Sequence, residues 1–218
     1  MALWGREARF RVAMACRLSV PRIWLALACI LFSTPLAAND AAEPSATELI
    51  EGLLSGRVPV GGPFELTDQT GHRRTDADFR GKLVVLYFGY TYCPDVCPAD
   101  LMAISSAIDL LGPAGNDVQP IFITVDPQRD TVEHLRDYVS SFHPRLIGLT
   151  GSQHDIRKLA VAYKVYYAKV ATEHGMPYAI DHTGFIYLVG RDGKYLGFFP
   201  PGTPPNRMVE IIRQHLPQ

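Results

Sequence analysis

The sequence predicts an α/β fold in which helices cover a mostly parallel sheet. Two runs support this prediction because they are apolar and carry no charge: Leu83–Phe88 (LVVLYF) and Val118–Val125 (VQPIFITV). Runs of this kind are typical of strands buried on both faces. A segment with apolar side chains at helical spacing follows each run, and strands separated by helices pair in parallel. A late pair of strands around a tight turn adds antiparallel strands.

The first half of the chain supplies a hairpin and the first helix. Pro63–Arg80 has a turn at Gln69–Gly71 between short stretches that mix polar and apolar residues, which predicts an N-terminal β-hairpin. Ala99–Leu111 follows the first buried run, and its apolar residues recur at every third or fourth position. A Gly-Pro pair comes directly after this segment and ends the predicted helix.

The second half of the chain alternates between the same two patterns. Arg191-Asp192-Gly193 separates two apolar runs and predicts a hairpin turn. The remaining predicted elements are a helix over Asp130–Phe142, a short strand over Leu146–Leu149, a helix over His154–Tyr163, an extended piece over Tyr166–Val170 before a polar loop, strands over Phe185–Val189 and Tyr195–Phe199, and a closing helix over Pro205–His215.

Composition indicates a globular protein with a mildly acidic body. The chain has 218 residues, of which 47% are hydrophobic and 20% charged, so it can bury a core and is too apolar for a disordered protein. The first 38 residues hold five of the 21 basic and one of the 22 acidic side chains, which leaves a net charge of −5 on the rest. This charge argues against a nucleic-acid partner, because phosphate neutralisation needs clustered Lys and Arg.

The N-terminal segment has the pattern of an export signal. Basic residues precede the uncharged apolar run Ile23–Phe32, and Ser33–Ala38 supplies small residues suited to cleavage. The apolar run is shorter than the roughly 20 residues of a membrane span, but the small residues after it are also uncharged. Cleavage and retention as a membrane anchor therefore both stay open. We expect a signal peptide or anchor over 1–38, a polar tether over 39–57 and a folded domain over 58–218.

Only two of the four cysteines lie in the predicted domain. Cys16 and Cys29 belong to the export segment, which leaves Cys93 and Cys97. A structural disulfide is the ordinary expectation for a cysteine pair in an oxidising compartment. A bridge across three residues, however, closes a very small loop and constrains the unfolded chain little. The close spacing therefore favours a chemical role over a structural one.

The two cysteines lie where the first buried strand gives way to a helix, in Tyr92–Pro98 (YCPDVCP). Pro94 and Pro98 favour an extended backbone at the cysteine before each of them, and Pro98 also suits a first helical turn. With Cys97 at the helix cap and Cys93 just before it, the positive end of the helix dipole is expected to lower the pKa of both thiols. This order of strand, cysteine loop and helix predicts a thioredoxin-like fold with an N-terminal β-hairpin and a late inserted β-hairpin.

Three residues separate the cysteines, whereas redox loops of the thioredoxin type have two. The extra residue leaves room for both sulfurs to hold one metal ion, and still lets them join when the metal leaves. Two thiolates and an imidazole suit copper(I) and, with an added oxygen ligand, copper(II), whereas zinc would require a fourth protein ligand. From the loop alone, a purely redox dithiol and a pair of inert buried thiols remain alternatives.

His182 is the one histidine whose surroundings suggest a metal ligand. It lies between a polar loop and the apolar strand Phe185–Val189, and Asp181 beside it is positioned to fix the imidazole tautomer. By position alone, a single loop histidine is more often structural than a ligand. The other six have ordinary explanations in turns, loops, helix surfaces and helix ends: His72, His134, His143, His154, His174 and His215.

Three segments together resemble a known family. Gly89–Pro98 (GYTYCPDVCP) resembles the signature of the SCO/SenC family of copper proteins for cytochrome c oxidase assembly. Thr124–Thr131 (TVDPQRDT) is similar to the family's second block, and Asp181–Thr183 with the strand after it is similar to the third. The resemblance extends roughly from Pro59 to Phe199, which is nearly the whole predicted domain.

The resemblance implies a role for each of five residues. Cys93 and Cys97 would be the sulfur ligands and His182 the nitrogen ligand, in a family that binds copper(I) and copper(II). Asp126 and Arg129 fall in the second block, and we interpret them as loop-fixing or partner-facing residues and not as ligands. Bacterial members of the family are often membrane-anchored, so we expect the bacterial periplasm, with the protein soluble or held at the inner membrane by its N-terminal segment.

The resemblance favours a copper metallochaperone over a true enzyme, and a thiol-disulfide oxidoreductase activity stays open. The chaperone would deliver copper by ligand exchange to the dinuclear copper site of a cytochrome c oxidase subunit. The alternative is a thiol-disulfide reductase that keeps the cysteines of that copper site reduced, and both roles can coexist. A peroxidase of the peroxiredoxin type is the weakest hypothesis. Expected partners are the oxidase copper-site subunit and other periplasmic copper chaperones or thiol reductants.

Overall fold

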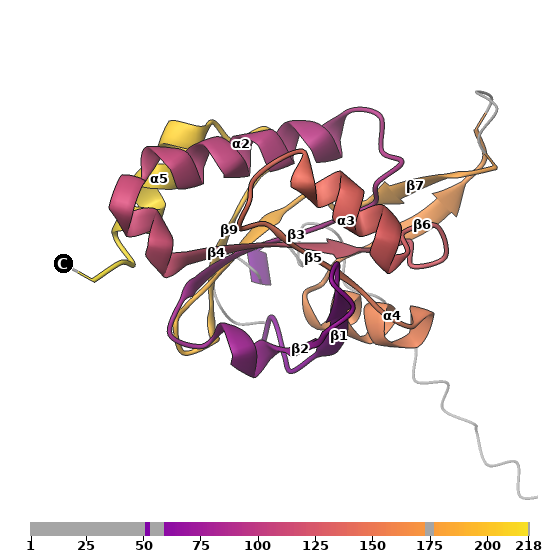
Figure 1. Ribbon diagram of the computed structural model, residues 1–218, viewed down its shortest axis with the longest axis horizontal. Helices are drawn as coiled ribbons and strands as arrows, with labels where there is room; N and C mark the ends of the chain where they lie inside the picture. The colour runs from indigo at the N-terminus through magenta and orange to yellow at the C-terminus, as the bar shows by residue number, and fades with distance from the viewer. Residues whose placement is uncertain (1–50, 53–58, 173–176, 218) are drawn as a thin grey trace, which may run out of the picture. The chain divides into compact units, whose positions relative to one another are not determined.

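The computed structural model describes residues 51–52, 59–172 and 177–217 (Figure 1). The chain divides into two units, residues 1–43 and 44–218, and the described residues all belong to the second. The expected signal peptide or anchor therefore lies outside the described residues, as does most of the expected tether. Among the helices that can be described, none has the length and apolar character needed to cross a membrane.

A seven-stranded sheet forms the centre of the domain, with the strand order β2-β1-β5-β4-β3-β8-β9. The three middle strands are parallel, and an antiparallel pair extends each edge. All seven residues of β3 are buried, as a run without charged residues predicts. The strands are β1 (Glu65–Asp68), β2 (Arg73–Thr75), β3 (Leu83–Gly89), β4 (Val118–Thr124), β5 (Ile147–Thr150), β8 (Ile186–Val189) and β9 (Tyr195–Phe199).

Helices cover both faces of this sheet. Figure 1 shows α2 and α5 side by side on one face, and α4 on the opposite face near β1 and β2. Two short 3-10 helices, η1 (Asp76–Phe79) and η2 (Gly112–Asp117), link the larger elements and were not expected from the sequence. The α-helices are α2 (Val96–Leu110), α3 (Val132–Ser140), α4 (Gln153–Ala162) and α5 (Pro205–Arg213).

A separate two-stranded sheet carries one of the candidate site residues. Its strands are β6 (Tyr167–Val170) and β7 (Ala179–His182), and they pair antiparallel with each other. The sequence predicted an extended piece at β6 but a loop in place of β7. The prediction of a loop was wrong because β7 is only four residues long, contains a charged residue and pairs with a near neighbour. These features weaken the alternation that identifies a strand. We call this pair the β6–β7 hairpin.

Candidate metal centre

The two cysteines lie where β3 ends and α2 begins, at the carboxyl edge of the parallel strands. Cys97 is completely buried, whereas Cys93 is partly exposed, and both are free thiols. The helix begins at Val96 after an Asp95 cap, so Cys97 lies in the first turn and not at the cap as expected. Its N–H donates to the sulfur of Cys93 over 3.4 Å. The start of the helix therefore directs a backbone donor at the more exposed sulfur.

Gly89 makes room for the buried sulfur. A Cβ atom at this position would come within 2.9 Å of the Phe122 ring and 3.0 Å of the Cys97 Sγ atom. Real Cβ contacts are essentially never so short, so a side chain here would displace the ring or the sulfur. Glycine at the end of β3 therefore lets Cys97 and the Phe122 ring lie against the sheet without being displaced.

His182 completes a group of three candidate ligands. It ends β7, and its Nε2 atom lies 3.2 Å from the Cys97 Sγ atom. The two sulfurs and the imidazole nitrogen all lie within 4.8 Å of one another. Metal bonds to sulfur and nitrogen are about 2.0–2.3 Å long, so one ion can contact all three after a small inward movement. Two thiolates and one imidazole form a soft donor set.

A backbone carbonyl orients the imidazole. The Nδ1 atom of His182 lies 3.1 Å from the carbonyl oxygen of Thr183, which favours a proton on Nδ1 and leaves the Nε2 lone pair facing the sulfurs. We expected Asp181 to fix this tautomer, but its side chain is exposed. Successive side chains of a strand point to opposite faces, so the neighbouring aspartate faces away. The rings of Tyr87 and Tyr90 meet the imidazole edge-on, with centroids 6.4 and 5.9 Å away.

The two thiols have opposite electrostatic surroundings. The pKa of Cys93 is lowered to about 4, chiefly because the Cys97 thiol donates a hydrogen bond to it, and contacts with His182 and backbone N–H groups act in the same direction. The same hydrogen bond, together with burial, raises the pKa of Cys97. The expected direction was thus right for Cys93, where the Cys97 hydrogen bond is the chief cause, and wrong for Cys97. The dipole argument omitted the burial of one sulfur and the contact between the two.

A buried carboxyl group near the cluster was missed in the sequence. Asp100 is 1% exposed and its Oδ1 atom accepts from the Gly202 N–H over 2.9 Å. Its Oδ2 atom has no hydrogen-bond partner among the described residues, and burial raises the pKa of the group. The sequence spacing could have indicated that Asp100 is buried. Asp100 follows Cys97 by three residues and precedes the core residue Leu101, which places it on the inner face of α2.

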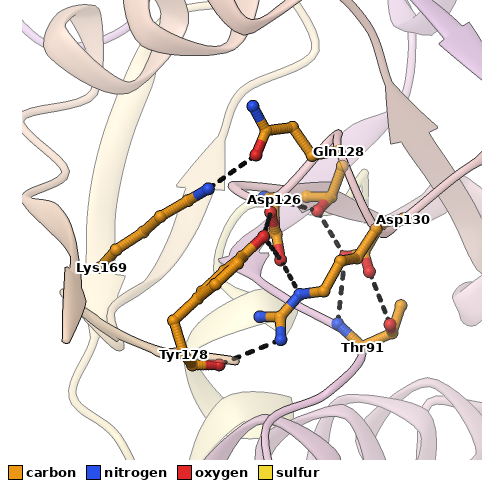
Figure 2. Close-up of polar contacts among 8 residues, drawn as sticks. Thr91, Asp126, Gln128, Asp130, Lys169 and Tyr178 are labelled. Carbon is orange, nitrogen blue, oxygen red and sulfur yellow. Dashed lines mark hydrogen bonds and ion pairs between the residues drawn. The ribbon is translucent and has the colours of Figure 1, made fainter. Parts of the chain in front are cut away.

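Asp126 and Arg129 lie beside the three candidate ligands and not among them. The Asp126 carboxylate is 1% exposed and forms an ion pair with the Arg129 Nε atom. The Tyr178 hydroxyl donates to the Asp126 Oδ1 atom over 2.9 Å (Figure 2). Arg129 Nη1 in turn donates to the Tyr178 carbonyl oxygen over 3.0 Å. These contacts attach the loop after β4 to the β6–β7 hairpin, which agrees with a loop-fixing role.

Asp130 attaches the same loop to the cysteine segment and was not singled out in the sequence. Its carboxylate accepts hydrogen bonds from the Thr91 N–H and hydroxyl over 3.0 and 2.6 Å, as Figure 2 shows. The hydroxyl of Thr124 donates to the same carboxylate. Asp130 is completely buried, and this burial raises its pKa. Three donors thus converge on the Asp130 carboxylate, and two of them come from Thr91, two residues before Cys93.

The fold and the cluster together define a thioredoxin-like protein with a Cys-Cys-His group at the start of its first long helix, which confirms the predicted fold class. A family model described as SCO1/SenC matches residues 54–217, and the chain belongs to this family.

Individual relatives agree with this assignment. The chain is 39% identical over 163 residues to the protein named SCO1 homolog, mitochondrial, of Homo sapiens, an alignment that covers 74% of this chain but only 54% of the human protein. It is 40% identical over 162 residues to an SCO2-like protein of Rickettsia prowazekii, covering 74% of this chain and 79% of that one. The structure of Bradyrhizobium japonicum ScoI with copper bound matches with a TM-score of 0.67 at 43% identity, covering 72% of this chain and 99% of that one.

Proposed function

We propose that this protein binds copper(I) and copper(II) through Cys93, Cys97 and His182, and delivers copper to the dinuclear copper site of a cytochrome c oxidase subunit. The observation that carries this proposal is the convergence of three soft donor atoms within 4.8 Å of one another. The family and the similar ScoI structure that holds copper support it. Three ligands from one protein leave coordination positions open, so an acceptor can bind the ion before the donor releases it.

The arrangement of the ligands indicates how copper would leave. Cys93 is the partly exposed sulfur, whereas Cys97 is completely buried. Thiolates of the acceptor would therefore approach from the Cys93 side and replace that ligand first. The Nδ1 atom of His182 faces the Thr183 carbonyl oxygen, which leaves the Nε2 atom directed at the metal position. Cys97 would be the last ligand released.

We also propose that the protein acts after export, in the bacterial periplasm, with residues 1–38 either cleaved or retained as an anchor at the inner membrane. The basic, apolar and small-residue order of that segment supports export. The partner is the oxidase copper-site subunit, and other periplasmic copper chaperones would load the protein.

A second candidate function is thiol-disulfide reduction of the acceptor, which the difference between the two thiols favours. The Cys93 thiolate would attack one sulfur of an acceptor disulfide and form a mixed disulfide. Cys97, after losing its proton, would attack the Cys93 sulfur and release the acceptor as a dithiol. The two electrons come from the Cys93–Cys97 pair, which ends as a disulfide, and a periplasmic dithiol reductant must restore it.

One experiment separates the two functions. The copper(I)-loaded protein is mixed with the isolated copper-site domain of the oxidase subunit, supplied either with reduced cysteines or as its disulfide. A chaperone transfers copper to the reduced acceptor, and His182→Ala abolishes this transfer because the loaded state is lost. A reductase opens the acceptor disulfide without copper and tolerates His182→Ala. Failure to transfer copper to a reduced acceptor would refute delivery.

A further inference from the structure

The position of His182 relative to the cysteines depends on how the β6–β7 hairpin is attached. Among the described strands, β6 and β7 pair only with each other, so no strand of the main sheet holds them. The cysteines, in contrast, follow directly from β3 in the middle of that sheet. The ligand set is therefore split between the main sheet and a small hairpin, and side-chain contacts between the two help to set the distance between the ligands.

Arg129 contacts both of these parts. Its Cζ atom lies 3.8 Å from the centroid of the Tyr178 ring, on the hairpin side, and 4.7 Å from that of the Tyr92 ring, directly before Cys93. Its Nη1 atom donates to the Tyr178 carbonyl oxygen over 3.0 Å. The Arg129 side chain is only 15% exposed. The guanidinium group thus contacts aromatic rings from both segments that carry the ligands.

A buried anion keeps this guanidinium group in place. Asp126 pairs with the Nε atom of Arg129 and also accepts from the Tyr178 hydroxyl, so three side chains fix one another. A planar guanidinium can pair with a carboxylate, donate to a carbonyl and stack on rings at the same time. A lysine ammonium has one charged atom and cannot occupy all of these positions.

Another attachment on this side of the hairpin is weaker than that of Arg129. Lys169 of β6 donates to the Gln128 Oε1 atom over 2.6 Å and lies 4.0 Å from the Tyr178 ring centroid (Figure 2). Both Lys169 and Gln128 are exposed, and an exposed polar contact contributes little to stability. Lys169 therefore offers a matched control, since it is a cation that contacts the same ring from the solvent side.

We infer that Arg129 is a positioning residue that holds His182 within binding distance of the two sulfurs. The inference rests on the proposed copper site, but its structural part concerns the metal-free protein. With Arg129 in place, the hairpin is fixed against the cysteine loop and the third ligand is pre-formed. Without it, the hairpin moves away from the loop and the site is reduced to its two sulfurs for part of the time.

The first test needs no metal. Hydrogen exchange of the metal-free protein is compared for the wild type, Arg129→Lys, Tyr178→Phe and Lys169→Gln. We expect amides of β6 and β7 to exchange about tenfold faster in Arg129→Lys, since about 1.4 kcal/mol of local stability corresponds to that factor. Tyr178→Phe should show a smaller increase, and Lys169→Gln almost none. Unchanged hairpin exchange in Arg129→Lys would overturn the inference, and so would an equal increase in β3 and β4, which would indicate loss of global stability.

The second test measures copper(II) affinity in a double-mutant cycle. Arg129→Lys is expected to raise the Kd about tenfold, as partners that orient a ligand commonly do. Removal of His182 should then cost less in the Arg129→Lys background than in the wild type, because the histidine there contributes only part of the time. Independent, multiplicative losses would contradict the inference. If the wild type bound no copper, the proposed function would fail while the exchange experiment would still decide the role of Arg129.

Discussion

The Nε2 atom of His182 lies 3.2 Å from the Sγ atom of Cys97, although 85 residues separate the two in the chain. One comes from the hairpin and the other from the first turn of α2. No strand pairing joins these two elements, since β7 pairs only with β6 among the described strands and α2 is a helix. The contact therefore reports directly on the tertiary structure, and four predictions follow from the surroundings of this pair.

The first prediction concerns thiol reactivity. Because the pKa of Cys93 is lowered to about 4, its thiolate should be fully formed at neutral pH and should persist until the pH falls toward that value. The rate of alkylation by iodoacetamide should then be nearly independent of pH between about 6 and 8, whereas that of an ordinary thiol falls about tenfold per pH unit below its pKa of roughly 8.5.

Cys97→Ala serves as the control for this measurement. It removes the hydrogen bond that contributes most to the lowered pKa, so the alkylation profile of Cys93 should shift to higher pH. A wild-type rate that rises about tenfold per unit from pH 6 to 8, as for an unperturbed thiol, would contradict the assignment.

The second prediction concerns Gly89. Gly89→Ala places a Cβ atom 2.9 Å from the Phe122 ring and 3.0 Å from the Cys97 sulfur, so we expect a loss of about 1–3 kcal/mol in the free energy of unfolding. Urea denaturation of the metal-free protein measures this loss. Gly197→Ala is the matched control, because it also lies in a strand and its Cβ atom would meet nothing within 4 Å. Equal stability of the two variants would refute the packing argument.

The third prediction concerns the buried carboxyl of Asp100. Burial raises its pKa, so the folded state disfavours the charged form. The resulting penalty is absent below the pKa of the unfolded chain and is complete once the pH exceeds the folded-state pKa. Asp100→Asn removes the charge while its side-chain oxygen can still accept from the Gly202 N–H.

Urea midpoints at acidic and neutral pH check this prediction. Relative to the wild type, Asp100→Asn should gain stability as the pH rises, on the order of 1 kcal/mol, the scale of a buried polar group that lacks a partner. If the stabilities of the two proteins changed in parallel across this pH range, burial would not raise the pKa of Asp100 and the prediction would be wrong.

Most of the fold could be predicted from the sequence because its central strands are mostly apolar and carry no charged residue. The strands β3 and β4 can be predicted from their own residues alone, and the helix after β3 can be predicted from the spacing of its apolar residues. The strand β7 could not be predicted, because AIDH has little apolar character and is defined by its pairing with β6. The start of α2 was placed two residues late, at Pro98 after a Cys97 cap, although the helix begins at Val96.

The site could be predicted only in part, and the reasons differ between residues. The spacing of Cys93 and Cys97 pointed to chemistry by itself, whereas His182 depended on the family resemblance. The orienting carbonyl of Thr183 left no signal, since every residue carries one. The place of Arg129 against Tyr178, 49 residues away, depends on tertiary packing that local patterns do not encode.

The copper affinity of His182→Ala against that of the wild type tests the central claim most directly. Both proteins are titrated with copper(II) under identical conditions, and Cys93→Ser and Cys97→Ser report the loss of each sulfur. The three-ligand site predicts one copper per chain in the wild type. It also predicts a Kd at least about 100-fold higher in His182→Ala, because even groups that only orient a metal ligand contribute up to about 100-fold in affinity. An unchanged Kd in His182→Ala would contradict the account, because the imidazole would then lie beside the sulfurs without binding the metal.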